Sequence, residues 1–182
     1  MYKYVGDISN IAHYIIMNFI QNKEVAIDGT LGNGHDTDFL SRNFKEVYSF
    51  DIQKGACDKY LKICPGNVKV INNSHENILE YVDKSVDCIM YNLGFLPGGD
   101  KSITTNHDSS LKSIKSGLKI LAEGGIMTIA LYRGHEEGKK EEEIILSYLK
   151  QINKSQYGVM IHNFHNRSEE APMLIVIEKN QK

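Results

Sequence analysis

Asp28-Gly-Thr-Leu-Gly-Asn-Gly-His-Asp36 is the stretch of sequence that decides the fold. The apolar run Val25-Ala26-Ile27 leads into it, and a segment that begins like a helix follows it. A strand, a glycine-rich turn and a helix in this order are typical of α/β proteins that bring a nucleotide-like ligand close to their backbone. The stretch therefore predicts a ligand site at the end of a strand.

Outward from this turn, short apolar segments alternate with helical patterns along the whole chain. The alternation predicts a doubly wound, mostly parallel seven-stranded sheet with helices on both faces. Ser9 or Asn10 is expected to cap the first helix, and Gly124-Gly125 to stop the fifth. Strands are expected over 25–28, 47–51, 68–72, 86–92, 126–131, 157–163 and 173–178, and helices over 10–20, 36–43, 55–63, 77–82, 108–122 and 139–152.

The composition suits one domain over residues 1–182. Hydrophobic residues make up 41% and charged residues 24%, and the net charge of −2 gives no global basic field. No apolar run reaches the roughly 18 residues of a membrane span, and no signal peptide pattern is seen. Cys57, Cys64 and Cys88 are odd in number and form no C-x-x-C pair, so reduced thiols in a cytoplasmic protein are expected.

Three ligand classes compete for the glycine-rich turn. A P-loop needs Lys-Ser/Thr where His35-Asp36 stands, and an aspartate there repels a triphosphate. A dinucleotide site needs a third glycine where Thr37 stands, although Asp51 could hold a ribose, so NAD stays open as the weaker option. An S-adenosylmethionine site needs an acid followed by small residues at +2, +4 and +6, which here are Asp28, Thr30, Gly32 and Gly34.

Polar residues at the ends of the neighbouring strands extend the S-adenosylmethionine interpretation. Asp28 would favour the cationic amino acid end of the cofactor by charge. Asp51, followed by Gln53, would accept hydrogen bonds from the ribose hydroxyls. Ser74 and His75 would meet the adenine edge. The alternative is that the glycines bind no ligand and only form a tight turn between the strand and the helix.

The fourth strand ends in Asn92-Leu-Gly-Phe95, which we interpret as the chemical site. Methyl transfer to an amine demands alignment above all, and the Asn92 carbonyl could accept an N–H and orient the lone pair. Phe95 could stack on a substrate base. The alternatives are a strand-end turn for Asn92 and a core position for Phe95.

Two further stretches border the same edge of the sheet. Pro97–Ser102 contains two consecutive glycines and is interpreted as a substrate loop or lid, with a plain linker as the alternative. Tyr132 and Arg133 follow the fifth strand and could contact RNA. His135 could relay a proton, with a plain surface histidine as the alternative. His162 and the other histidines lack a third ligand at zinc spacing, so no metal is expected.

Taken together, Asp28 to Asp36, Phe50-Asp-Ile-Gln53, Ser74-His75 and the run from Asn92 to Thr105 resemble a known family. It is the small bacterial family MnmM, formerly labelled rRNA methylase, and the similarity covers nearly the whole chain. The resemblance implies a class I, Rossmann-like methyltransferase with S-adenosyl-L-methionine as donor. It implies methylation of 5-aminomethyl-2-thiouridine at the wobble position of tRNA. The cofactor contacts that it implies are Asn33, Asp36, Asp51, Gln53, Ser74 and His75.

Other functions stay open at this point. The chain departs from the family with Phe95 where tyrosine is frequent and around Arg133, which concerns the substrate side. Methylation of rRNA or of a small-molecule amine, and a non-catalytic nucleotide- or RNA-binding module, are the alternatives. Lys112, Lys115 and Lys119 form a stripe at helical spacing that is either a solvated face or a tRNA contact. A homodimer is expected as a way to enlarge the RNA surface.

Overall fold

The computed structural model describes residues 2–94 and 105–181 of the chain. Within these ranges seven strands form one sheet in the order β3-β2-β1-β4-β5-β7-β6. The strands are β1 (Val25–Asp28), β2 (Glu46–Phe50), β3 (Val68–Ile71), β4 (Val86–Leu93), β5 (Leu121–Leu131), β6 (Tyr157–His162) and β7 (Met173–Lys179). The predicted seven-stranded sheet is therefore confirmed.

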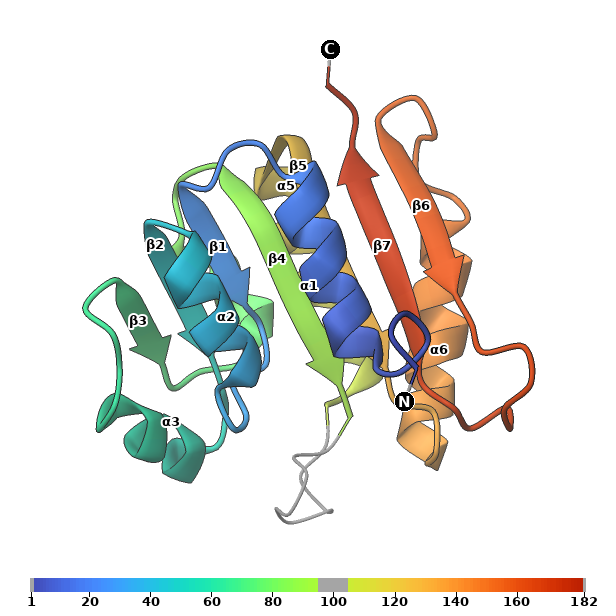
Figure 1. The fold of residues 1–182 in the computed structure, drawn as a ribbon, viewed down its shortest axis with the longest axis horizontal. Helices are drawn as coiled ribbons and strands as arrows, with labels where there is room; N and C mark the ends of the chain where they lie inside the picture. Colours follow the sequence, from blue (N-terminus) through green and yellow to red (C-terminus); the bar gives the residue numbers. More distant parts are fainter. Residues whose placement is uncertain (1, 95–104, 182) are drawn as a thin grey trace.

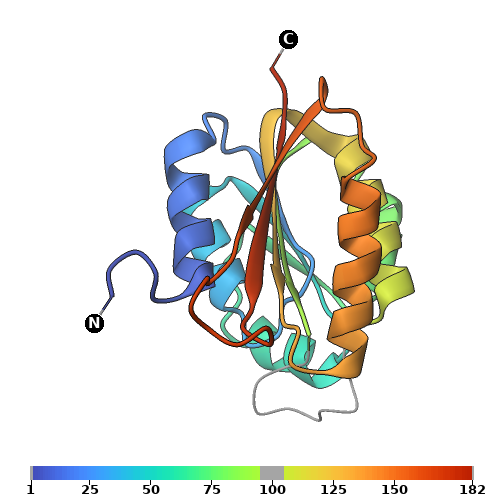
Figure 2. The same ribbon diagram turned by 90° about the vertical axis from the view of Figure 1, so that its right-hand side faces the viewer.

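Helices cover both faces of this sheet (Figures 1 and 2). One apolar cluster lies under α1 (Ile8–Phe19), α2 (His35–Asn43) and α3 (Lys54–Leu61). A second lies under α4 (Ile78–Tyr81), α5 (His107–Ile120) and α6 (Glu136–Leu149), and a short 3₁₀ turn, η1 (His75–Asn77), precedes α4. The two clusters confirm the predicted doubly wound fold, because each face of the sheet is buried by its own helices.

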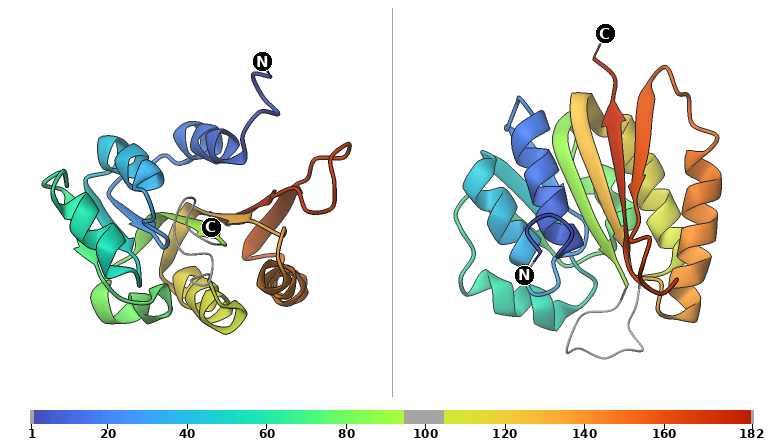
Figure 3. Two further views of the ribbon diagram at one scale, coloured as in Figure 1. Left: turned by 90° about the horizontal axis from the view of Figure 1, so that it is seen from below. Right: turned by 45° about the vertical axis from the view of Figure 1, so that its right-hand side comes forward.

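The strand directions place the carboxyl ends of the parallel strands on one edge. Strands β1 to β5 pair in parallel, while β7 is antiparallel to both β5 and β6. The arrowheads of β1 and β4 point to the lower edge in Figure 1, and the left view of Figure 3 looks onto that edge. The strand order reverses between β1 and β4, so a ligand crevice is expected there.

The first helix begins earlier than the sequence predicts. Its N-cap is Asp7, whose carboxylate accepts the backbone N–H of Ser9 at 2.8 Å. The prediction of Ser9 or Asn10 was wrong because all three residue types cap helices well, and the apolar spacing alone does not choose among them. The helix is held by Ile8 and Ile16, which are buried against the sheet.

The junction of α5 and β5 also differs from the prediction. Helix α5 ends at Ile120 and β5 starts at Leu121, whereas the helix was expected to reach Ala122 and stop at Gly124-Gly125. The two glycines lie inside β5, where the pairing with β4 shifts register. Gly124 has φ +73°, a conformation that glycine adopts without strain, so the pair forms a bulge in the strand. No helix in the described ranges is long and apolar enough to cross a membrane.

Candidate active site

A cavity of about 680 Å³ opens at the carboxyl edge where the strand order reverses. Its walls come from the start of α1, the turn after β1, the ends of β2 to β5 and the start of α5. The volume lies in the range of sites that hold a nucleotide-sized ligand. The predicted site residues that line it are Gly32, Asn33, Asp36, Asp51, Gln53, Ser74, His75, Asn92 and Tyr132.

Asp28 lies beneath this cavity rather than in its wall. Its side chain is buried, and its carboxylate accepts the backbone N–H of Thr30 at 2.9 Å and the hydroxyl of Thr37 at 2.6 Å. Burial, together with the nearby charge of Asp36, raises the pKa of Asp28 to about 7. Asp28 therefore holds the turn in shape, a role that the sequence alone did not separate from cofactor contact.

Two glycines allow the turn to pack as closely as it does. A Cβ added at Gly29 would lie 2.3 Å from the ring of Tyr91, which real side chains do not tolerate. Gly34 has φ +85° and is the N-cap of α2, a position where L side chains are strained. Gly29 thus allows the turn to approach Tyr91 closely, and Gly34 allows the left-handed backbone at the start of α2. Both features are typical of a ligand-binding loop.

Asp51 joins the end of β2 to the glycine-rich turn. Its two carboxylate oxygens accept the backbone N–H groups of Gly32 and Gln53, each at 2.8 Å. A carboxylate oxygen has more than one acceptor site, so the group can still accept hydroxyl hydrogens from the cavity that it lines. This arrangement fixes the carboxylate before any ligand binds.

His75 presents a buried acceptor at the wall of the cavity. Its Nδ1 lies 3.1 Å from the carbonyl oxygen of Gly29, and because a carbonyl only accepts, Nδ1 carries the proton. Burial lowers the pKa of His75 to about 4, which keeps the ring neutral at physiological pH. Its Nε2 is buried and has no hydrogen-bond partner among the described residues. The structure thus offers one lone pair to an N–H group of a ligand.

The end of β4 is tied to two other elements by a chain of side chains. Asn92 donates from Nδ2 to one carboxylate oxygen of Asp36 at 2.5 Å, and His13 Nε2 lies 2.7 Å from the other. The backbone N–H of Asn92 donates to the hydroxyl of Thr30 at 2.7 Å. Since Asp36 takes the amide N–H, the Asn92 carbonyl is the end of the amide left to accept a hydrogen bond from a substrate.

His13 is a site residue that the sequence did not single out. Its ring stacks on that of Phe39, with centroids 3.8 Å apart and planes within 6°. Both His13 and Asp36 line the cavity. Its partner lies 23 residues away, and no local motif links the two positions. Other residues that were missed come from the starts of α1 and α5, namely Asp7, Ser9, Asn10, Thr105, Asn106 and Ser109.

The predicted substrate residues after β5 fall in different places. Tyr132 lines the cavity and lies beside Gly94 at the end of β4. Arg133 donates to Glu142 at 2.8 Å and, through Nη2, to the Ala171 carbonyl at 2.7 Å, so it braces the chain before β7. His135 is the N-cap of α6, accepting the N–H of Gly138 at 3.0 Å. Only Tyr132 of the three contributes to the cavity wall.

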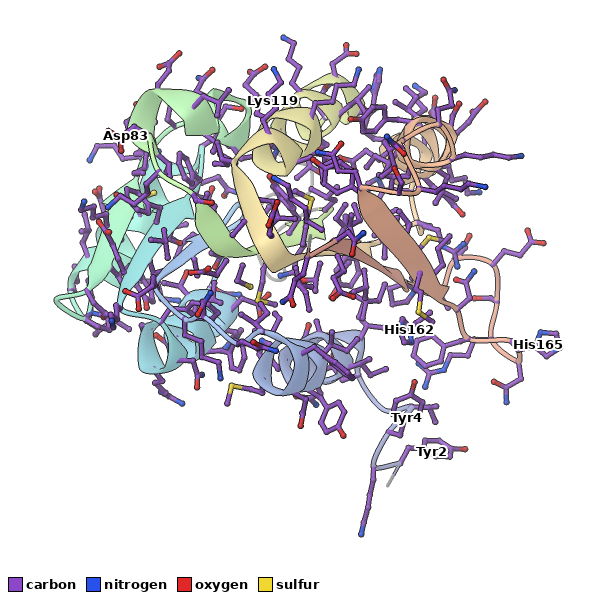
Figure 4. All side chains as sticks on the ribbon, turned by 90° about the horizontal axis from the view of Figure 1, so that it is seen from above. Tyr2, Tyr4, Asp83, Lys119, His162 and His165 are labelled. Atoms are coloured by element: carbon purple, nitrogen blue, oxygen red, sulfur yellow. The ribbon has the colours of Figure 1, made fainter. Side chains whose placement is uncertain are left out.

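Some predictions lie outside the site or outside the described residues. Phe95 and the Pro97–Ser102 loop fall in the segment 95–104, which the structure does not describe. Of the lysine stripe, Lys112 pairs with Glu76 at 3.2 Å and Lys115 lies over the ring of Tyr148. Figure 4 shows Lys119 near the end of α5 that is remote from the cavity. Within 2–94 and 105–181, no group of three or more His, Cys, Asp or Glu side chains is arranged to hold a metal ion.

Comparison with known proteins gives the geometry a family context. The family model described as "Putative rRNA methylase" matches residues 47–178. The tRNA (mnm(5)s(2)U34)-methyltransferase, chloroplastic, of Arabidopsis thaliana is 31% identical over 95% of this chain and 69% of that protein.

Two solved structures share both sequence and fold with this chain. The putative rRNA-methylase of Clostridium thermocellum has a TM-score of 0.90 at 32% identity, covering 98% of this chain and 99% of that one. A putative methyltransferase of Streptococcus mutans, solved in complex with SAH, has a TM-score of 0.86 at 32% identity, covering 96% and 99%. The fold is therefore the Rossmann-like fold of S-adenosylmethionine-dependent methyltransferases.

Proposed function

This chain belongs to the putative rRNA methylase family, and from that membership we propose that it is an S-adenosylmethionine-dependent tRNA N-methyltransferase. The reaction converts the 5-aminomethyl group of 2-thiouridine at wobble position 34 to 5-methylaminomethyl. The observation that carries the proposal is the Asn92–Asp36–His13 chain at the cavity, because it presents an oriented amide carbonyl beside a carboxylate. The name of the plant relative supplies the nucleoside.

The polar groups of the cavity match those of S-adenosylmethionine. Asp51 accepts the ribose hydroxyls, since its carboxylate is already fixed by two backbone N–H groups. The buried Nε2 of His75 accepts an N–H group of the cofactor. This atom has no hydrogen-bond partner among the described residues, so the cofactor supplies the missing one. Asn33, Gln53 and Ser74 complete the contacts from the same wall. This donor and acceptor set suits a cation with a diol and a purine better than a triphosphate.

On the substrate side, Asn92 orients the amine. S-adenosylmethionine supplies an electrophilic methyl group on its sulfonium. The Asn92 carbonyl accepts an N–H of the neutral amine and points the nitrogen lone pair toward that methyl group. The Asp36 carboxylate stabilises the positive charge that develops on the nitrogen, and His13 holds Asp36 in place. Phe95 is proposed to pack on the base, while Arg133 holds the chain before β7 and His135 caps α6.

The decisive experiment is a methylation assay with the purified protein and S-adenosylmethionine. The substrate is tRNA that carries 5-aminomethyl-2-thiouridine, and the products are read by mass spectrometry of nucleosides. We expect 5-methylaminomethyl-2-thiouridine to appear at position 34. Transfer RNA lacking the aminomethyl group is the matched control and stays unmodified. The proposal fails if the aminomethyl nucleoside is left unchanged.

The family description also names rRNA, so rRNA is the second substrate in the same assay. Methylated rRNA with unchanged tRNA would make the chain an rRNA enzyme with the same cofactor site. A homodimer and a cytoplasmic location are further parts of the proposal. Light scattering of the purified protein measures the first, and fractionation of cells measures the second.

A further inference from the structure

A second, smaller cavity of about 200 Å³ lies beside the active-site cavity. It is bounded by the N-terminal segment before α1, by the residue after β5 and by the chain between β6 and β7. The two cavities share Asp7 and Tyr132 as wall residues. A group seated in the smaller cavity is therefore a direct neighbour of a group seated in the larger one.

One wall of the small cavity carries a guanidinium stacked on an aromatic ring. The guanidinium of Arg167 lies 3.6 Å from the centroid of the Phe164 ring, a stacked arrangement. Arg167 also donates from Nη2 to the carbonyl of Val5 at 3.1 Å, which joins the N-terminal segment to the chain after β6. Planar rings and guanidinium groups are the surfaces on which unpaired bases stack.

A carboxylate in the wall of the same cavity favours a base over a phosphate. Asp7 lines the cavity, and its carboxylate would repel a phosphate but accepts N–H groups from the edge of a base. Tyr132 is 39% exposed, and its backbone N–H donates to the Leu93 carbonyl at 3.0 Å, which fixes the backbone that carries the ring. Its side chain lies against Gly94 at the end of β4 and also lines the small cavity.

We propose that the small cavity binds an unpaired nucleobase of the RNA, next to the nucleotide that is methylated. The larger cavity takes the cofactor and the target group, and the smaller volume accepts one planar ring system. Stacking on the guanidinium of Arg167, which the Phe164 ring supports from behind, supplies affinity, and Asp7 favours bases that present an amino group. The inference rests on the proposed function, because it requires an RNA substrate. Tyr2 and Tyr4, in the same N-terminal segment, are also exposed (Figure 4).

The test uses Phe164→Leu and Arg167→Gln in the full-length protein, with an anticodon stem-loop RNA carrying the aminomethyl nucleoside. Leucine keeps apolar bulk but removes the ring on which the guanidinium stacks, and glutamine keeps an N–H for the Val5 carbonyl but removes the planar charge. We expect the KM for RNA to rise about 10-fold in each variant, with kcat and the Kd for S-adenosylmethionine unchanged. His165→Ala is the matched control, because His165 projects from the same loop away from the body of the protein (Figure 4).

A binding experiment separates this inference from the proposed function. Stem-loops with 2-aminopurine on either side of the target nucleotide report stacking by loss of fluorescence. Quenching at one position in the wild type, lost in Phe164→Leu but kept in His165→Ala, supports the cavity as a base site. Equal RNA binding by Phe164→Leu, Arg167→Gln and the wild type overturns it. If the wild type does not methylate the stem-loop, the proposed function fails, and the fluorescence still decides the base site.

Discussion

The two halves of the carboxyl edge are built in different ways. On the side of β1 and β2, the contacts join groups close in sequence or on adjacent strands, as when Asp51 accepts the N–H groups of Gly32 and Gln53. Around the end of β4 and the start of α1, the contacts join distant segments, as when Asn92 and His13 meet Asp36 and when Arg167 meets Val5. The first half is a preformed cradle, and the second is an assembly of side chains whose positions depend on the whole fold.

This difference predicts that substitutions in the two halves change different kinetic constants. The cradle determines cofactor affinity, because its donors and acceptors are fixed before binding. The assembled half determines turnover and RNA affinity, because it orients the amine and the neighbouring nucleotides. Four substitutions test this division, beginning with the one expected to have the largest effect.

Asn92→Ala is expected to lower kcat about 100-fold or more, since the amine loses the acceptor that aligns it. The Kd for S-adenosylmethionine should stay within about twofold of wild type, because the cradle is untouched. Steady-state kinetics and calorimetry measure the two constants. Asn18→Ala is the control, since Asn18 is exposed and its side chain donates to the Tyr14 carbonyl of its own helix. A large loss of cofactor affinity in Asn92→Ala would show that the halves are not separate.

Asp51→Ala is expected to weaken S-adenosylmethionine binding about 10-fold or more, because a charged hydrogen-bond acceptor is lost. The loosened turn adds to the effect, as the N–H groups of Gly32 and Gln53 lose their partner. Calorimetry measures the change. Asp58→Ala serves as the control, since Asp58 makes only an exposed ion pair with Lys54. Unchanged affinity in Asp51→Ala would remove Asp51 from the cofactor site.

His13→Ala is expected to lower kcat about 10-fold with little change in cofactor Kd, because Asp36 loses the contact that holds it. His13→Gln should recover most of the rate, since its amide N–H can reach Asp36. Tyr14→Ala, an exposed neighbour on the same helix, controls for general effects of altering α1. If glutamine and alanine are equally slow, holding Asp36 is not the role of His13.

Asp28→Asn is expected to change turnover least and to alter the pH dependence of stability. The pKa of Asp28 is raised to about 7, so the folded protein binds a proton that the unfolded chain releases above its ordinary pKa of 3.8. The free energy of unfolding therefore falls as pH rises from about 4 to about 7. Asparagine cannot ionise, so Asp28→Asn should gain about 1 kcal/mol or more relative to wild type over this window.

His75 acts in the opposite direction and must be separated from Asp28. Its pKa is lowered to about 4, so the unfolded chain binds the extra proton and stability rises with pH through the range up to 6.5. The contribution of His75 to the free energy of unfolding is the same in the wild type and in Asp28→Asn. It therefore cancels when the stabilities of the two proteins are subtracted. Urea unfolding of both proteins at pH 5 and pH 8 measures that difference. A difference that does not depend on pH would contradict the raised pKa of Asp28.

What could be predicted from the sequence differs between the same two halves of the carboxyl edge. The strand ends that carry Asp51, His75 and Asn92 were predicted, because short apolar runs place strand ends and parallel strands share an edge. The N-cap at Asp7 and the bulge at Gly124 were not, because several local structures suit the same residues there. The structural role of Arg133 was also missed, since its partners Glu142 and Ala171 lie in later elements.

The residues along the chain were sufficient to specify the doubly wound sheet, the glycine-rich turn and the acids at the strand ends. Each of these depends on local propensity and on the fixed geometry of parallel strands, which are encoded over a few neighbouring positions. Only the tertiary structure brings His13 into contact with Asp36, buries Asp28 beneath the cavity and forms the small cavity between the N-terminal segment and Phe164. Those arrangements arise from contacts between distant segments, whose distances are set by the packing of the whole chain.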